Sequence, residues 1–121
     1  MLILIVDDEV HVARSIERIL RRDGYDVRTA RSGPEALRLL DGIDLLLTDI
    51  QMAGMTGLEL VAEVKRLHPA LRCCVMSADA GAEGMESTSP LVDARIGKPF
   101  THQALLALVR GDGGLRDRAV S

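Results

Sequence analysis

The stretch LILIVDDE at residues 2–9 joins five apolar residues to three adjacent acids. The run Leu2–Val6 is short, wholly apolar and rich in branched side chains, which is typical of a strand buried on both faces. Such strands belong to parallel sheets that helices cover on both sides. Asp7, Asp8 and Glu9 would then follow the carboxyl end of the first strand. The stretch therefore predicts an α/β fold with acids gathered at one edge of its sheet.

The rest of the chain repeats the same alternation. We expect further strands at residues 25–30, 43–48, 71–76 and 94–97, and helices at residues 10–22, 33–40, 57–67 and 102–110. Five strand–helix units with right-handed crossovers favour a flavodoxin-like, doubly wound (βα)5 sandwich with a parallel sheet in the order 2-1-3-4-5. The glycine- and serine-rich residues 80–90 predict a short or irregular fourth helix with above-average mobility. Residues 1–110 are expected to form one domain, and residues 111–121 a tail or linker.

Composition narrows the class of protein. The 121 residues are 47% apolar with a net charge of −3, which indicates a globular chain and argues against direct nucleic-acid binding. The adjacent Cys73 and Cys74 lie in an apolar run and predict buried thiols rather than a disulfide. Neither a signal peptide nor a membrane span is recognisable, so we expect a cytoplasmic protein without a membrane partner.

Acids follow two of the expected strands. Asp7 and Asp8 end the first strand and Asp49 ends the third, and these two strands are neighbours in the order 2-1-3-4-5. Neighbouring strands lie about 4.8 Å apart, so the three carboxylates should share the crevice where such folds bind ligands. Like charges this close repel unless a cation or a proton intervenes. Hard oxygen ligands without histidine or cysteine favour Mg²⁺, with Mn²⁺ possible.

Two further groups follow the remaining strands. Ser77 ends the fourth strand, and Lys98 follows the fifth, about 10 Å from Asp49 by strand spacing. A metal-binding acid cluster with a hydroxyl and an ammonium is suited to phosphoryl transfer. Each residue alone has an ordinary explanation, since Asp7 or Asp8 could cap a helix and Lys98 could be solvated. All five at strand ends favour one common site.

Four motifs carry a family resemblance. They are VDDE at residues 6–9, LLLTDIQMAGMTGLEL at 45–60, VMSAD at 75–79 and GKPF at 97–100. In this order and at these spacings they resemble the receiver domain of two-component response regulators, over about residues 2–110. The resemblance implies that Asp49 accepts a phosphoryl group from a sensor histidine kinase or a phosphotransfer protein. Such a domain is a signalling switch rather than an enzyme, because it catalyses only its own phosphorylation and dephosphorylation.

The resemblance also assigns roles around Asp49. Asp8 would bind Mg²⁺ directly, Asp7 would bind it as a second ligand or through water, and the backbone carbonyl of Gln51 would be the third protein ligand. Ser77 would hydrogen-bond the phosphoryl group, and Lys98 would form an ion pair with it. The Lys98–Pro99 bond is expected to be cis.

Phosphorylation should reshape the face made by the fourth helix, the fifth strand and the last helix, for a downstream protein or output domain. Relatives usually carry Tyr or Phe three residues before the lysine, whereas this chain has Arg95, which we expect to make charged contacts on that face. By the same resemblance, Gln51 and Asp79 would occupy positions beside the phosphorylation site that influence how fast the phosphoryl group is lost to water.

Two other functions remain open at this point. One is a Mg²⁺-dependent aspartyl-phosphate phosphatase with Asp49 as the nucleophile. Common enzymes of that kind carry DxDxT at the nucleophile, whereas Asp49 is followed by Ile50, Gln51 and Met52. The other is a receiver-like interaction module that works without phosphorylation, against which the complete acid, hydroxyl and lysine set argues.

Overall fold

The computed structural model describes residues 1–78 and 90–111. Its strands are β1 Leu2–Val6, β2 Asp26–Ala30, β3 Leu45–Asp49, β4 Arg72–Ser77 and β5 Ala94–Gly97, and its helices are α1 Val10–Arg22, α2 Gly33–Leu37, α3 Gly57–Leu67 and α5 His102–Arg110. The predictions for residues 80–89, for Asp79 and for residues 112–121 lie outside the described residues.

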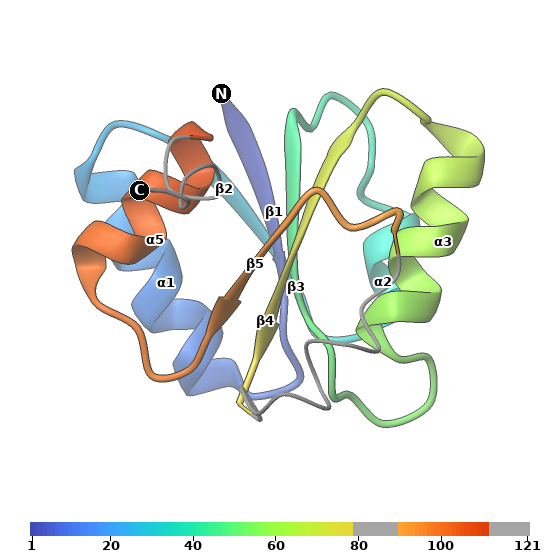
Figure 1. Cartoon of the computed structure of the whole chain (residues 1–121), viewed down its shortest axis with the longest axis horizontal. Coiled ribbons are helices and arrows are strands. Elements are labelled where there is room, and N and C mark those ends of the chain that lie inside the picture. The colour runs from blue at the N-terminus through green and yellow to red at the C-terminus, as the bar shows by residue number, and fades with distance from the viewer. Residues whose placement is uncertain (79–89, 112–121) are drawn as a thin grey trace.

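The five strands form one parallel sheet in the order β2-β1-β3-β4-β5 (Figure 1). This confirms the flavodoxin-like doubly wound fold. The strand order reverses at β1, so β1 and β3 lie side by side although β2 separates them in the chain. Because all the strand pairs are parallel, the carboxyl ends of the five strands lie at the same edge of the sheet.

Helices cover both faces of the sheet, as the apolar strands predict. Figure 1 shows α1 and α5 on one face and α2 and α3 on the other. Alternate side chains of one strand enter different cores: Leu45 and Leu47 pack with α1 and α5, whereas Leu46 packs with α2 and α3. Every residue of β3 is buried, which places Asp49 at the end of the most enclosed strand.

The second helix is shorter than the periodicity predicts. It ends at Leu37 rather than at Leu40. The N–H groups of Arg38 and Leu39 donate to carbonyls three residues back, which is a turn and not an α-helical bond. The Arg28 guanidinium then donates hydrogen bonds from Nη1 to the carbonyl oxygens of Leu39 and Asp41, at 3.0 and 2.6 Å. The predicted boundary at Leu40 was therefore wrong, and a side chain from β2 fixes the turn that follows the helix.

The other boundaries agree within one or two residues. The third strand begins at Leu45 rather than at residue 43, because the Ile43 N–H bonds to Leu40 in the turn. The hydroxyls of Ser32, Thr56 and Thr101 cap α2, α3 and α5. In the described parts of the chain, no helix combines the length and apolar character that crossing a membrane requires.

The two cysteines are buried free thiols, as their apolar run predicts. Burial raises the pKa of Cys73 to about 11 and the pKa of Cys74 to about 12. Both therefore stay protonated and unreactive at neutral pH.

Candidate functional site

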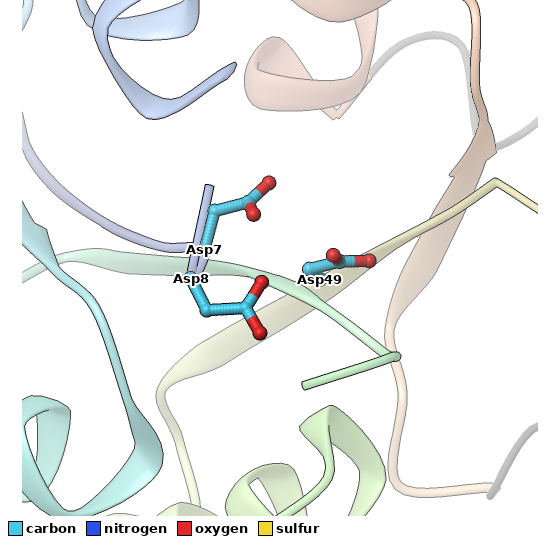
Figure 2. Close-up of side chains that lie close together, drawn as sticks. All are labelled: Asp7, Asp8 and Asp49. Carbon is cyan, nitrogen blue, oxygen red and sulfur yellow. The ribbon is translucent and has the colours of Figure 1, made fainter. Parts of the chain in front are cut away.

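Three carboxylates meet at the carboxyl ends of β1 and β3. Asp7 and Asp8 follow β1, Asp49 ends β3, and the two strands pair directly. One oxygen of each carboxylate lies within 4.8 Å of an oxygen of the other two. Figure 2 shows Asp8 and Asp7 leaving successive positions of one segment and Asp49 facing them from the next strand. The predicted acid cluster is therefore present.

The three acids differ in exposure. Asp7 is fully buried and Asp49 is 7% exposed, whereas Asp8 is open to solvent. The Glu9 N–H donates to Asp7 Oδ1 at 2.9 Å, and the Ala53 N–H donates to Asp8 Oδ2 at 3.4 Å. The first residue before α1 is Glu9, whose side chain makes no capping bond. Helix capping therefore does not explain why the two aspartates are there.

Lys98 reaches the cluster from the far side of β4. Its Nζ lies 3.2 Å from Asp7 Oδ2 and 3.4 Å from Asp49 Oδ2, and the lysine side chain is only 17% exposed. The Lys98 N–H donates to the Ser77 carbonyl at 2.8 Å, so the end of β4 fixes where the lysine begins. The long side chain closes the gap of two strands that the sequence predicts.

Ser77 ends β4 and is almost completely buried at this edge. Its register partner on β5 is Gly97, the residue before Lys98. The structure thus brings Asp7, Asp8, Asp49, Ser77 and Lys98 to one edge of the sheet. Gln51, two residues beyond Asp49, lies in the loop that follows β3, and its backbone acts to lower the pKa of the Asp49 carboxyl.

The electrostatics of the site favour a bound cation. Burial raises the pKa of Asp49 most strongly, and the Asp7 charge raises it further, while Lys98 and the Gln51 backbone oppose them without cancelling the rise. Three carboxylates against one ammonium leave the cluster negative by two charges when all are ionised. A divalent cation would remove that imbalance.

The donor set fits Mg²⁺ or Mn²⁺. The cluster offers only carboxylate oxygens, which are hard ligands, and its oxygens are close enough to share one ion. The exposure of Asp8 leaves one side of the cluster open to water, and Mg²⁺ retains several water ligands in protein sites. These residues could therefore hold a divalent ion.

The backbone under Asp49 is held by residues that sequence reasoning missed. The Thr48 hydroxyl donates to the Asp49 carbonyl at 2.9 Å in a buried bond. A Cβ on Gly57 would lie 2.1 Å from the same carbonyl oxygen, so α3 begins in direct contact with this peptide. A sequence signal for the start of α3 was present, since Thr56 and Glu59 form a capping box. The signal for Thr48 was a polar residue inside an apolar run.

Comparisons with known proteins agree with this geometry. The family model described as the response regulator receiver domain matches residues 3–110. The chain is 31% identical over 106 residues to the transcriptional regulatory protein GlrR of Escherichia coli, covering 85% of this chain and 24% of that protein. It is 34% identical over 113 residues to the response regulator MprA of Mycobacterium avium, covering 91% of this chain and 50% of that protein.

Solved structures show the same likeness. The response regulator TrrA of Thermotoga maritima, solved in complex with Mg²⁺-BeF, superposes with a TM-score of 0.83 at 28% identity, over 91% of this chain and 96% of that one. The chain spans a quarter to a half of the length of the two curated relatives above.

Proposed function

The chain belongs to the receiver-domain family of response regulators, and on that premise we propose that it is a switch phosphorylated on Asp49. Receiver domains are signalling domains and not enzymes in the ordinary sense. The observation that carries the proposal is the position of Lys98, whose ammonium lies between the buried carboxylates of Asp7 and Asp49. A cation aimed at a candidate nucleophile is what a phosphoryl group on that nucleophile needs.

The proposed reaction is a transfer between two side chains. An Asp49 carboxylate oxygen attacks the phosphorus of a phosphohistidine on a sensor histidine kinase or a phosphotransfer protein. The new phosphorus–oxygen bond forms as the phosphorus–nitrogen bond breaks, and the histidine leaves as the imidazole after it takes up a proton. The raised pKa of Asp49 makes its carboxylate more basic, and therefore a better nucleophile once ionised.

Contacts in the cluster distinguish the proposed metal ligands. Both oxygens of Asp7 are engaged, one by the Glu9 N–H and the other by Lys98. Asp8 is exposed, and among the described residues its carboxylate accepts only a long contact from the Ala53 N–H. We therefore assign Asp8 and Asp49 as direct ligands, with the Gln51 carbonyl as a third and Asp7 acting through water or as a further ligand. Bound Mg²⁺ would neutralise phosphoryl oxygens during transfer.

The other two residues would bind the transferred group. Ser77 is placed to hydrogen-bond a phosphoryl oxygen from the end of β4, and Lys98 to pair with another. The phosphoryl group adds about −1.5 to −2 charges where Lys98 already sits, so the lysine should move from Asp7 toward it.

The output is proposed from the relatives. GlrR and MprA are regulators that extend well beyond the length of this chain. We propose that the receiver acts on a downstream protein or output domain through β5, α5 and the expected fourth helix, which falls outside the described residues. Arg95, exposed on β5, would make charged contacts on that face.

Intact mass spectrometry tests the proposal directly. The chain is incubated with acetyl phosphate and Mg²⁺, beside Asp49→Asn and a Mg²⁺-free sample. One added phosphoryl group is expected on the native chain alone and only with Mg²⁺. No adduct under excess donor would rule out the switch, and steady release of phosphate without an adduct would indicate a phosphatase instead.

Beryllofluoride with Mg²⁺ tests the interaction module. As a phosphoryl mimic it should shift backbone amide resonances of β5 and α5 in a phosphorylatable switch. Unchanged resonances, together with unmodified Asp49, would favour a module that works without phosphorylation.

A further inference from the structure

Thr48 is a fully buried polar residue in the middle of the sheet. Its register partners are Val6 on β1 and Val75 on β4, and both belong to the core under α2 and α3. Valine has nearly the shape of threonine, so packing alone would be satisfied by valine here. The hydroxyl is the feature that packing does not explain.

The Thr48 hydroxyl has a specific partner. Its Oγ1 donates to the carbonyl oxygen of Asp49 at 2.9 Å, entirely out of solvent. Buried hydrogen bonds of this kind are not weakened by competing water. The bond therefore fixes the plane of the peptide that leaves Asp49.

The same peptide is held from its other sides. Gly57, the first residue of α3, is packed so closely against the Asp49 carbonyl that no Cβ would fit. The Ile50 N–H donates to the Met76 carbonyl at 3.0 Å, and the Gly57 N–H donates to the Ile50 carbonyl at 2.8 Å. Contacts from β4, α3 and the Thr48 side chain thus converge on the Asp49–Ile50 peptide, and α3 also holds the Ile50 carbonyl of the next peptide.

We propose that Thr48 is a positioning residue for the reaction at Asp49. By holding the Asp49 carbonyl it sets the direction of the Asp49 carboxylate and of the chain that continues to Gln51. The inference rests on the proposed function, since it concerns the orientation of the proposed phosphoacceptor. Thr48 touches neither the phosphoryl donor nor the metal, and acts through the backbone alone.

The effect should be of the size that one hydrogen bond gives. Transfer to Asp49 requires the attacking oxygen in line with the leaving group, and small displacements of the nucleophile slow such reactions. Thr48→Val keeps the shape of the side chain and removes the donor. We expect roughly a three- to tenfold fall in the maximal rate of phosphorylation by acetyl phosphate.

The experiment compares three variants with the native chain. Thr48→Val removes the hydroxyl and Thr48→Ser keeps it. Val64→Ala opens a cavity in the same core, away from the Asp49 carbonyl, and controls for lost stability. Each is measured for urea stability, for the dependence of phosphorylation rate on acetyl phosphate concentration, and for Mg²⁺ affinity by amide chemical shifts.

The expected pattern separates positioning from packing. Thr48→Val should lower the maximal rate and weaken Mg²⁺ binding, Thr48→Ser should restore both to within about twofold, and Val64→Ala should lower stability while leaving both unchanged. Native rate and Mg²⁺ affinity in Thr48→Val, or an equal loss in Val64→Ala, would overturn the inference. If the native chain is never phosphorylated, the proposed function fails, and Mg²⁺ affinity alone then decides whether Thr48 positions Asp49.

Discussion

Gly57→Ala should damage the fold and the site together, because Gly57 touches the peptide that carries Asp49. A Cβ at this position would lie 2.1 Å from the Asp49 carbonyl oxygen, 2.7 Å from the Ile50 Cα and 2.8 Å from the Asp49 carbonyl carbon. All three are backbone atoms, so no side chain can rotate away to make room. Either α3 or the end of β3 must move.

The magnitude follows from these distances. Relieving the shortest contact needs a displacement of about 1 Å, and strain of this kind costs about 1–3 kcal/mol of unfolding free energy. Alanine regains up to about 1 kcal/mol through its better helix propensity. We therefore expect a net loss of about 1–2 kcal/mol, or about 1 M in the urea midpoint. A displacement of 1 Å at a reacting group also predicts a tenfold to hundredfold slower phosphorylation, roughly.

Gly24→Ala is the matched control. Gly24 has φ +96 after the end of α1, and apart from its chain neighbours no atom of the described residues lies within 4 Å of its Cβ position. Alanine there costs about 1–2 kcal/mol through left-handed backbone strain, far from the site. Urea denaturation should show both variants destabilised, and intact mass time courses should show only Gly57→Ala slowed. A Gly57→Ala variant as stable and as fast as the native chain would refute the reasoning.

Three further outcomes are expected. Without Mg²⁺, Asp49→Asn should be more stable than the native chain at pH 7, because burial raises the folded-state pKa of Asp49 above its unfolded value and makes the ionised form costly. The gain in stability should shrink as the pH falls through that raised pKa toward 4. Urea titrations at several pH values would show or exclude this trend. Arg72→Met should lower stability by about 1 kcal/mol and speed hydrogen exchange at the end of α5, since the Arg72 guanidinium donates to the Leu108 carbonyl at 3.0 Å; unchanged exchange there would contradict this role. Thr101→Ala should cost about 1 kcal/mol by removing the hydroxyl that caps the Ala104 N–H, with thermal unfolding as the measurement and native stability as the contrary result.

The sequence predicts which residues meet at the site better than it predicts the contacts that hold those residues in place. Apolar runs that end in Asp7, Asp49 and Ser77 mark strand ends, and in a parallel sheet strand ends converge whatever the details of packing. The length of the lysine side chain was enough to predict that Lys98 reaches Asp49. These inferences need only the strand order and the length of the Lys98 side chain, and both can be inferred from a single sequence.

The parts that sequence reasoning missed depend on contacts between distant segments. Helix α2 ends early because the N–H groups of Arg38 and Leu39 bond to carbonyls three residues back, and Arg28, on a neighbouring strand, then holds the turn through the carbonyls of Leu39 and Asp41. The contact of Gly57 with Asp49 joins two backbones, and periodicity carries no information about such an approach. Thr48 stands out in the sequence only as a polar residue inside an apolar run, and its contact with Asp49 depends on the direction of its hydroxyl.

The lysine contacts suggest how a change at Asp49 would travel. Lys98 is shared between Asp7 and Asp49, and its backbone N–H is bonded to the end of β4. A phosphoryl group on Asp49 would strengthen the attraction of Lys98 to Asp49 and weaken its contact with Asp7. The movement of Lys98 would then pull on the segment that joins β5 to α5. The far end of α5 is held separately, because Arg72 at the start of β4 binds the Leu108 carbonyl. Because α5 is bonded to β4 near its last turn and follows Lys98 in the chain, movement of Lys98 should tilt the first turn of α5 more than its last.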